Sequence, residues 1–600
     1  MCGIAGILKV LPDNERGALD RTLEVLRSEL RHRGPDDAGT WHSACGKTHF
    51  VYTRLAILDL SAAGQQPMTT ADRRFTITFN GEIYNFRELR SDLERAGVQF
   101  RTGTDTEVLL ALFERHGTDC VGKLRGMFAF CIWDAQEERA FLARDPLGIK
   151  PLYYSLQDDG SLVFASELKA LRRSGLVGTA VDGQAVLAYL ETGSVPEPLT
   201  LLKGVFCLRA GCWLQWRKGT LQEQCYWRLR FDRPETNMSA GEAKSLVREA
   251  LLDSVRQHFV SDVPVGIFLS GGIDSTALLA LSREVGQNDI RTFSIGVEDA
   301  ALDESAVARE TAARFGTAHH ELRLSGEMAE ESFAEFLRCG DQPSIDGFNT
   351  FTVARFARRE GMKVVLSGLG GDEMFAGYPS FTQVPKLARL HRFAHAMSPI
   401  DGLVGAGMER WGRSPRARRL GTMLRRPPGI ASAYRAFRGV FSGRVARELV
   451  RRYVADPPSD IAGYAGDPAL AADEQDQVSE LELSRYMRNQ LLKDSDMMSM
   501  AHGLELRVPL VDQRLFEAVS RVPAALRLRR GKAMLLEAVP EVPHEIAQAR
   551  KRGFVFPFET WLQESCGEEF TAVRRALPAP NPTWYQGRSL FLLERWLKQG

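Results

Sequence analysis

Two short apolar runs in the C-terminal part of the chain each lead directly into a glycine-rich turn. The first run, 263–269, ends at the turn 270–275, and a helical pattern follows over 276–285. The second run, 362–366, leads into the glycine-rich turn 367–373. A strand followed by a glycine loop and a helix is typical of parallel α/β sheets. We therefore predict an α/β parallel-sheet domain that contains both turns.

The length of the chain indicates more than one domain, because 600 residues exceed what one hydrophobic core usually organises. The polar stretch 231–237 combines proline with charged residues and lacks periodicity, so we place a linker there. Immediately after it, the apolar residues of 239–259 follow the spacing of an amphipathic helix. The predicted organisation is a domain over 2–215, a linker over 216–239 and a second domain over 240–600.

The N-terminal part alternates predicted strands with predicted helices. The apolar segment 74–79 stops at the Asn-Gly turn 80–81, and the apolar segment 127–133 is a second strand. Between them, 86–96 and 106–116 carry apolar residues at helical spacing. This mixture predicts an α+β domain built from layers of sheet and helix.

The composition excludes several classes of protein. Hydrophobic residues make up 44% of the chain, charged residues 26%, and the formal net charge is +1, values typical of a soluble enzyme. No apolar run approaches the roughly 20 residues that span a bilayer, and the N-terminus lacks the pattern of a secretory signal. The 9 cysteines are scattered without a Cys-x-x-Cys pair, so neither a disulfide framework nor a zinc site is expected. These features predict a cytoplasmic protein with no membrane partner.

One strongly basic stretch, 410–426, raises the alternative of a nucleic-acid or acidic partner. Its arginines include Arg413, Arg416, Arg418, Arg419 and Arg425. Its only aromatic residue is Trp411, which is too little for a platform that stacks bases. Because the rest of the chain is balanced in charge, we interpret the stretch as solvated surface and expect no nucleic-acid partner.

Cys2 is a candidate nucleophile. Removal of the initiator methionine would place a thiol and a free α-amine on this one residue. The α-amine titrates near ~7.7–8.0 and the thiol near ~8.5, so the amine can accept the thiol proton around neutral pH. The resulting thiolate could attack an amide carbonyl. The alternative, for a lone cysteine, is an ordinary buried side chain.

Five other residues offer partners for this nucleophile. The side-chain amide of Asn80 and the N–H of Gly81 could stabilise an oxyanion, although an Asn-Gly pair also forms plain turns. Arg54 could clamp the α-carboxylate of an amino acid, and Glu82 and Asp105 could receive its ammonium group. Each of these charges, taken alone, would be read as solvated surface.

Seven motifs in the first third of the chain resemble the class II glutamine amidotransferase domain, an N-terminal nucleophile hydrolase that releases ammonia from glutamine. The motifs are Met-Cys-Gly-Ile-Ala-Gly at 1–6, Arg-His-Arg-Gly-Pro-Asp at 31–36, Arg-Leu at 54–55, Gln-Pro-Met at 66–68, Asn-Gly-Glu-Ile-Tyr-Asn at 80–85, Thr-Asp-Thr-Glu at 104–107 and Arg-Asp-Pro-Leu-Gly at 144–148. The resemblance implies a sandwich of stacked antiparallel sheets flanked by helices. It implies that Cys2 is the nucleophile and that Asn80 and Gly81 form the oxyanion hole. It also implies that glutamine is bound by Arg54, Glu82 and Asp105.

A phosphate-binding loop is expected at 270–275. The only Walker-like candidate, 46–48, is rejected because Trp41 stands where the first glycine belongs. In 270–275, two glycines expose backbone N–H groups at a helix N-terminus, whose dipole favours anions, and Asp274 can hold magnesium. The alternative for this segment alone is a tight turn between strand and helix.

The C-terminal motifs resemble the asparagine synthetase family, whose ATP-pyrophosphatase-type domain forms an adenylate on its substrate. The segment 270–275 resembles the pyrophosphate loop, 367–373 the second loop, and 292–296 the strand that meets adenine through main-chain atoms. The resemblance implies ATP contacts by Ser270, Gly271, Gly272, Asp274, Ser275, Ile295, Ser367 and Gly368. It also implies Mg²⁺ at Asp274 and Asp372, charge stabilisation by Lys551, and a largely helical C-terminal part. The family motifs 491–501 and 504–512 have Met and Leu spacing that suits a buried helix, so we interpret them as architectural.

Together the motifs imply a two-step reaction. Ammonia released at Cys2 passes through an internal channel and attacks a carboxylate that ATP has adenylated. The expected partners are glutamine, ATP and a carboxylate acceptor, with Mg²⁺ as the ion, and a homodimer is expected from the resemblance alone. Aspartate is the favoured acceptor.

Leu369 departs from the family pattern. Typical asparagine synthetases have glutamate at this position, and leucine can neither transfer a proton nor orient a nucleophile by charge. The Ser-Gly-Leu-Gly-Gly-Asp form occurs in some asparagine synthetases, and it also occurs in amidotransferases of polysaccharide and secondary-metabolite pathways. The alternative acceptor is therefore another carboxylate, such as a sugar acid, a peptide side chain or a biosynthetic intermediate.

Overall fold

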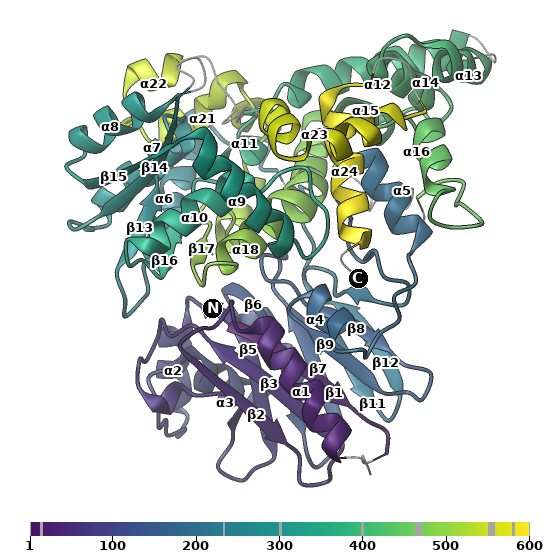
Figure 1. Cartoon of the computed structure of the whole chain (residues 1–600). Helices are drawn as coiled ribbons and strands as arrows, with labels where there is room; N and C mark the ends of the chain where they lie inside the picture. The colour runs from purple at the N-terminus through teal and green to yellow at the C-terminus, as the bar shows by residue number, and fades with distance from the viewer. Residues whose placement is uncertain are drawn as a thin grey trace.

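The computed structural model describes residues 2–11, 16–231, 234–298, 303–397, 401–461, 471–549, 558–578 and 582–598. Figure 1 shows an N-terminal part with two stacked sheets and a larger part in which helices surround a third sheet. The strand pairs of the first two sheets are antiparallel, and those of the third are parallel. The predicted fold class is confirmed: an antiparallel sandwich followed by a parallel α/β sheet and a largely helical part. The exact domain boundaries stay a prediction.

The first sheet has the strand order β10-β8-β9-β1-β3-β2. Its strands are β1 (Cys2–Leu8), β2 (Asp37–His42), β3 (Thr48–Arg54), β8 (Tyr153–Leu156), β9 (Leu162–Ala165) and β10 (Phe206–Cys207). Alternate side chains of β1 point to opposite faces, so Ala5 and Ile7 pack on the outer helices α1 (Arg16–Leu30) and α4 (Leu168–Arg173). Cys2 and Ile4 therefore face inward, toward the second sheet.

The second sheet has the order β12-β11-β7-β6-β5-β4. Its strands are β4 (Met68–Thr69), β5 (Phe75–Ile83), β6 (Gly126–Asp134), β7 (Arg139–Arg144), β11 (Cys212–Arg217) and β12 (Thr220–Cys225). Cys131 and Trp133 of β6 face the first sheet, while Phe130 and Ile132 pack toward α2 (Phe86–Arg95) and α3 (Asp105–His116). The two predicted helices and the strand predicted at 127–133 are confirmed. The strand predicted at 74–79 is also present, but it continues through Asn80 and Gly81 to Ile83, so the predicted Asn-Gly turn is wrong: both residues pair with β6.

One expectation about the cysteines is wrong. Cys212 and Cys225 lie opposite each other in the β11–β12 pair and form a disulfide. The sequence did not suggest this bond because the two residues are 13 positions apart, and only the hairpin register brings them together. The cysteine pattern therefore no longer argues for a reducing compartment.

The third sheet brings the two predicted glycine turns to neighbouring strand ends. Its order is β15-β14-β13-β16-β17. The strands are β13 (Val265–Phe268), β14 (Arg291–Val297), β15 (Ala318–Leu324), β16 (Val364–Leu366) and β17 (Glu505–Arg507). One face packs on α6 (Ala240–His258), α7 (Ile273–Glu284), α8 (Ser305–Arg314), α19 (Gln513–Ser520) and α21 (Ala533–Ala538), and the other on α10 (Phe348–Arg359). Because β13 and β16 are parallel neighbours, the loops that follow them meet at one edge of the sheet.

Helices make up most of the remaining chain. They include α9 (Gly326–Cys339), α11 (Gly371–Met374), α12 (Ser380–Met397), α13 (Asp401–Trp411), α14 (Pro415–Leu424), α15 (Ile430–Arg438), α16 (Gly443–Val450), α17 (Glu474–Leu481), the π-helix η3 (Glu482–Leu492), α18 (Lys493–Met500), α20 (Ala524–Arg527), α22 (His544–Gln548), α23 (Phe558–Arg575) and α24 (Trp584–Lys598). Figure 1 shows α5 (Gly183–Thr192) beside α24, and the Tyr189 hydroxyl donates to the Ser589 carbonyl at 2.8 Å. A segment of the N-terminal third is thus built into the C-terminal helices. Among the described helices, none combines the length and apolar character that crossing a membrane requires.

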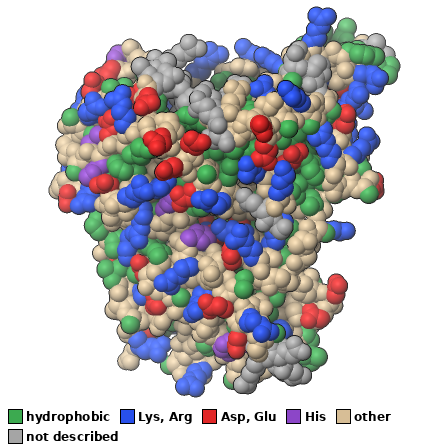
Figure 2. Space-filling view, in the orientation of Figure 1, with side chains coloured by type: hydrophobic (Ala, Val, Ile, Leu, Met, Phe, Trp, Pro, Cys, Tyr) green, Lys and Arg blue, Asp and Glu red, His purple; other side chains and the backbone are tan. Residues whose placement is uncertain are grey.

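The basic stretch is only partly solvated. In Figure 2, basic side chains gather at the upper right, where Figure 1 places α13 and α14. Arg413 and Arg416 are exposed, as expected. Arg418, in contrast, is buried and donates to the Gly412 carbonyl at 3.1 Å. The interpretation as solvated surface is therefore wrong for Arg418, because its position in α14 turns it toward the end of α13.

Candidate active sites

A small cavity of about 30 Å³ lies at the inner edge of the sandwich. Of the residues predicted for the first site, Cys2, Arg54, Gly81, Glu82 and Asp105 all line it. They come from the start of β1, the end of β3, the end of β5 and the start of α3. The pairing of Cys2 with Arg54 in the β1–β3 register explains why the first two are neighbours.

Cys2 is held by contacts on its backbone and its thiol. The Cys2 N–H donates to Asn80 Oδ1 at 3.0 Å, and Arg33 Nε donates to the Cys2 carbonyl at 3.2 Å. Asn80 Nδ2 is buried and has no hydrogen-bond partner within the described part of the chain. Gly81 is required beside it, because a Cβ there would lie 2.2 Å from the Met127 carbonyl oxygen. Asn80 thus offers an unused donor next to the candidate nucleophile.

Sequence reasoning missed Tyr52, which contacts the thiol directly. Its hydroxyl lies 2.7 Å from Cys2 Sγ. Burial raises the pKa of the Cys2 thiol, while the hydrogen bond from Tyr52 and the charge of Arg54 lower it in part. Burial also raises the pKa of Tyr52 well above its usual value, so this phenol stays protonated and can donate to a thiolate. The only available signal was that Tyr52 precedes Arg54 by two residues on one strand, and therefore shares its face.

Two buried carboxyl groups face the same cavity. Asp105 Oδ2 accepts from the Ile83 N–H at 2.9 Å, and burial raises the pKa of Asp105 to about 6. Burial and the charge of Glu505 raise the pKa of Glu82 well above its usual range, against the opposing charge of Arg507. Arg507 Nη2 lies 3.5 Å from Glu82 Oε1, although Arg507 belongs to β17 of the third sheet. The second part of the molecule therefore borders the first site.

A buried ion network joins the Cys2 backbone to α18. Arg33 Nη2 lies 2.7 Å from Asp496 Oδ2, and Arg33 Nη1 lies 3.1 Å from Glu167 Oε1. Lys150 Nζ lies 3.2 Å from the other oxygen of Asp496. The side chains of Arg33, Lys150, Glu167 and Asp496 are all buried. Because water does not solvate them, each charge is compensated by the others.

We expect Asp496→Ala to destabilise the protein, because it leaves Lys150 and part of Arg33 as uncompensated buried charges. The free energy of unfolding should fall by about 3 kcal/mol, measured by urea denaturation. Asp158→Ala, at an exposed aspartate, is the control and should change it by less than about 0.5 kcal/mol. Equal stability of the two variants would contradict a role for the network.

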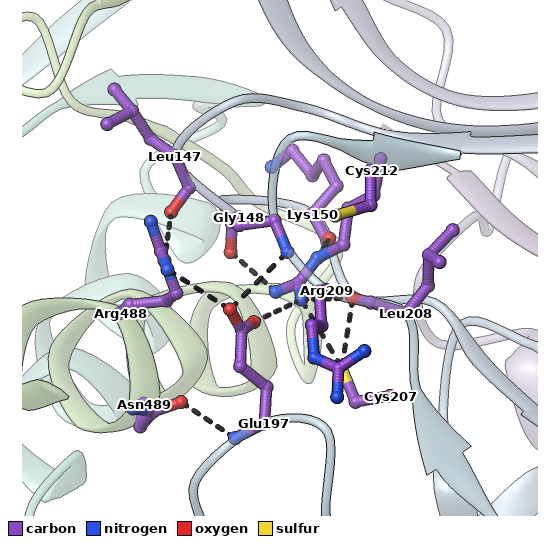
Figure 3. A network of polar contacts seen from close by, with 12 residues as sticks. Leu147, Gly148, Lys150, Glu197, Cys207, Leu208, Arg209, Cys212, Arg488 and Asn489 are labelled. Atoms are coloured by element: carbon purple, nitrogen blue, oxygen red, sulfur yellow. Dashed lines mark hydrogen bonds and ion pairs between the residues drawn. The ribbon is translucent and has the colours of Figure 1, made fainter. Parts of the chain in front are cut away.

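A second, half-buried network crosses between the same two parts (Figure 3). Arg488 of η3 donates to Glu197 Oε1 at 3.1 Å and to the Leu147 carbonyl at 3.2 Å. Asn489 Oδ1 accepts from the Glu197 N–H at 2.9 Å. Arg144 Nη1 lies 2.7 Å from the other oxygen of Glu197. The N-terminal sandwich and the helical part are thus joined by specific polar contacts.

A larger cavity of about 410 Å³ lies at the carboxyl ends of β13, β14 and β16. The predicted ATP and metal residues that line it are Ser270, Asp274, Ser275, Ile295, Ser367, Gly368 and Asp372. Gly271 and Gly272 form the turn before α7 but do not line the cavity. Lys551 lies outside the described residues. Leu369 lines the cavity, so the departure from the family pattern falls within the site.

The two loops approach each other closely because glycines occupy the contact. A Cβ on Gly368 would lie 2.8 Å from the Ser275 backbone nitrogen. A Cβ on Gly371 would lie 2.3 Å from Asp274 Oδ1. Across the turn, the hydroxyls of Ser270 and Ser275 are 2.9 Å apart. The arrangement presents hydroxyl, N–H and carboxylate groups at one helix N-terminus, as an anion and its counter-ion require.

Lys532 is a second residue that sequence reasoning missed. Its Nζ lies 2.5 Å from Asp274 Oδ2 and 2.6 Å from Asp372 Oδ1. Burial alone would lower the pKa of Lys532, but the two carboxylates raise it. In the sequence it is one lysine in a basic run, 258 positions from Asp274, and nothing local points to the site.

The segment 491–501 is buried as predicted, but it is not purely architectural. Leu491, Asp494 and Ser495 also line the larger cavity. On the same helix, Asp496 points to the Arg33 network near the first cavity. Because residues two apart on a helix face nearly opposite directions, α18 borders both sites.

Comparison with known proteins is consistent with these two sites. Residues 1–227 match the glutamine amidotransferase domain, and residues 246–583 match asparagine synthase. Asparagine synthetase [glutamine-hydrolyzing] 1 of Bacillus subtilis is 32% identical over 95% of this chain and 89% of its own length. A putative asparagine synthetase of Mycobacterium bovis is 34% identical over 94% of this chain and 88% of its own length. Amidase chry2 of Gibberella zeae is 28% identical over 94% of this chain and 90% of its own length.

The molecule combines a sandwich that has a cysteine at its inner edge with a parallel sheet that has a cavity at its glycine loops. This combination defines a glutamine amidotransferase coupled to an ATP-using synthetase. The chain belongs to the asparagine synthase family. It is an ATP-dependent, glutamine-hydrolysing carbon–nitrogen ligase, and glutamine and ATP are its small-molecule substrates.

Proposed function

We propose that the chain is a glutamine-dependent asparagine synthetase, which converts aspartate, glutamine and ATP into asparagine, glutamate, AMP and pyrophosphate. The observation that carries the proposal is the presence of two different sites in one molecule. One surrounds Cys2 and the other surrounds Asp274, Asp372 and Lys532. Relatives named asparagine synthetase, which match over most of their length, support aspartate as the acceptor.

In the first half-reaction, Cys2 Sγ attacks the side-chain amide carbon of glutamine. Asn80 Nδ2 and the Gly81 N–H are assigned to the oxyanion, and ammonia leaves as a thioester forms. Water then releases glutamate and the free thiol. Arg54 would bind the α-carboxylate of glutamine, since two backbone carbonyls already fix its guanidinium and leave other N–H donors. Glu82 and Asp105 would bind the α-ammonium group.

In the second half-reaction, an oxygen of the acceptor carboxylate attacks the α-phosphorus of ATP, and pyrophosphate leaves. Lys532 and the 270–275 loop would hold the pyrophosphate, Ile295 the adenine and Lys551 the developing charge. Asp274 and Asp372 fit a magnesium ion, because two carboxylates that converge beside serine hydroxyls are the hard oxygen donors it prefers. Such an ion would neutralise phosphate charge.

Transfer completes the reaction. The nitrogen of ammonia attacks the acyl carbon of the adenylate, AMP leaves, and the nitrogen loses a proton to give the amide. Ammonia would be protonated in bulk solvent and lose its nucleophilicity, so we propose that it moves inside the molecule. The networks around Arg33 and Glu197 hold the two parts together, as such a transfer requires. Magnesium, a homodimer and a cytoplasmic location also stay predictions.

The acceptor is the least constrained part of the proposal. Leu369 lines the larger cavity and cannot act as an acid or a base. The similarity to amidase chry2 supports the alternative that another carboxylate is amidated. The test is a screen of carboxylates for ATP-dependent release of pyrophosphate and AMP. We expect aspartate to give the highest kcat/KM, and failure of aspartate beside success of another acid would overturn the asparagine assignment.

We expect Tyr52→Phe to slow glutamine hydrolysis and to move the acid limb of its pH–rate profile to higher pH. Hydrolysis needs the thiolate, and the Tyr52 hydrogen bond lowers the pKa of Cys2, so its loss raises that pKa. A hydrogen bond to a charged group contributes about 1.5–3 kcal/mol, which corresponds to a loss of roughly ten- to a hundredfold. The measurement is glutamate release as a function of pH. Tyr154→Phe, on β8 of the same sheet, is the control, and an unshifted profile in Tyr52→Phe would contradict this role.

A further inference from the structure

The larger cavity has an acidic end that the ATP site does not explain. The acidic residues that line the cavity are Asp274, Glu304, Asp346, Asp372, Glu373 and Asp494, and its described lining contains no Lys or Arg. Asp274 and Asp372 are compensated by Lys532. Asp346 and Asp494 belong to other elements than the glycine loops: the loop before α10 and the helix α18. The end of the cavity that contains Asp346 and Asp494, called the acceptor end below, is therefore lined by acidic side chains.

Asp494 has an unused oxygen at this end. The side chain is only 3% exposed. Its Oδ2 accepts from the Ser344 hydroxyl at 2.6 Å, whereas its Oδ1 has no hydrogen-bond partner anywhere in the described ranges. Leaving a buried carboxylate oxygen without a partner costs free energy. A bound group that donates to Oδ1 would remove this cost.

Asp346 is held close to Asp494 by the loop that carries it. The Asp346 N–H donates to the same Ser344 hydroxyl at 3.4 Å. Gly347 follows with φ +94°, and a Cβ there would lie 3.3 Å from Asp494 Cβ, so the loop packs directly on α18. Burial, and then the charge of Asp346, raise the pKa of Asp494 to about 8. The two carboxyl groups are thus coupled, and a bound cation would favour the ionised form of Asp494.

The cations next to this pair do not line the cavity. Lys493 lines a separate small cavity that also contains Arg144 and Glu197. Arg588 of α24 acts on Asp346 electrostatically but is not part of the described cavity lining. Asp346 and Asp494 belong to no described group of three potential metal ligands, so two carboxyl groups are all that this end offers a metal ion. An organic cation on the cavity side fits the geometry best.

We propose that Asp346 and Asp494 form a subsite for a positively charged nitrogen of the acceptor. The substrate class is then a short carboxylate that also carries an ammonium or similar cationic group, with its carbon chain against Leu369 and Leu491. The inference rests on the proposed function, because it concerns the acceptor of that reaction. Aspartate belongs to this class, whereas sugar acids without an amine do not.

The test compares acceptors that differ only in the amine. Pyrophosphate release is measured with aspartate and with succinate, which has the same carbon chain without the amine. If the screen selects another acceptor, that acid and its deaminated counterpart replace the pair. We expect wild-type protein to favour the amine-bearing acid by about 10- to 100-fold in kcat/KM, as for hydrogen bonds to a charged group. In Asp494→Asn and Asp346→Asn this preference should largely disappear, with the KM for ATP and the glutaminase rate little changed.

Glu304→Gln is the matched control, because Glu304 lines the same cavity but lies beside Gly271 of the first glycine loop, and it should not alter the preference. Equal use of both acids by wild-type protein, or an unchanged preference in Asp494→Asn, would overturn the subsite while leaving the proposed function intact. If the two Asn variants raised the KM for ammonium but kept the preference for the amine-bearing acid, the subsite would also be overturned. Asp346 and Asp494 would then be assigned to the binding of ammonia. Absence of AMP formation with every carboxylate would overturn the proposed function, and this inference with it.

Discussion

Cys2→Ala is expected to abolish glutamine-dependent amidation, by about 10³-fold or more, while added ammonium still supports the synthetase reaction. Among the described residues that line the first cavity, Cys2 carries the only thiol, and a thioester needs one. The larger cavity, in contrast, contains no atom of Cys2 and should adenylate its acceptor as before. The measurements are glutamate release and AMP formation, with glutamine or ammonium as the nitrogen source.

Cys131→Ala is the matched control for this variant. Cys131 is also a buried cysteine, and it lies in the same layer between the two sheets but not in the cavity around Cys2. We expect it to retain glutaminase activity. Loss of both activities in Cys2→Ala, with the fold intact, would contradict the assignment of the two reactions to separate sites.

Lys532→Met is expected to give the opposite result. It removes the cation that Asp274 and Asp372 share, so these carboxylates and the departing pyrophosphate lose a charge partner. Removal of one charge-stabilising group from such a site typically costs about 10²–10³-fold in rate. Ammonium-dependent pyrophosphate release should fall by this amount, while glutamate release continues.

Arg530→Met is the control for Lys532→Met, since Arg530 is an exposed cation two residues earlier in the chain. It should leave pyrophosphate release near the wild-type rate. If the two variants behaved alike, the contacts of Lys532 with the loop carboxylates would have no part in the reaction.

The residues that could be predicted from the sequence are those whose motifs place several functional groups close together. Asn80, Gly81 and Glu82 are consecutive on β5, and one strand pairing brings Arg54 to Cys2. The same holds for the two glycine loops, because parallel neighbouring strands bring their carboxyl ends together.

The residues that were missed depend on tertiary structure. Tyr52 carries no motif of its own and acts only through its side of β3. Lys532 reaches Asp274 from a distant part of the chain, and Arg507 crosses from the third sheet to Glu82. The burial of Arg418 likewise follows from the packing of two helices. Local patterns contain no information about such long-range contacts.

The most direct test of the account follows the nitrogen itself. Glutamine labelled with ¹⁵N in its side-chain amide is supplied with ATP, acceptor and an excess of unlabelled ammonium. The account predicts that the amide product stays enriched in ¹⁵N above the ratio of the bulk solution, and that one AMP forms for each amide. Product with the isotope ratio of the bulk ammonium, or amide formed without AMP, would contradict the account.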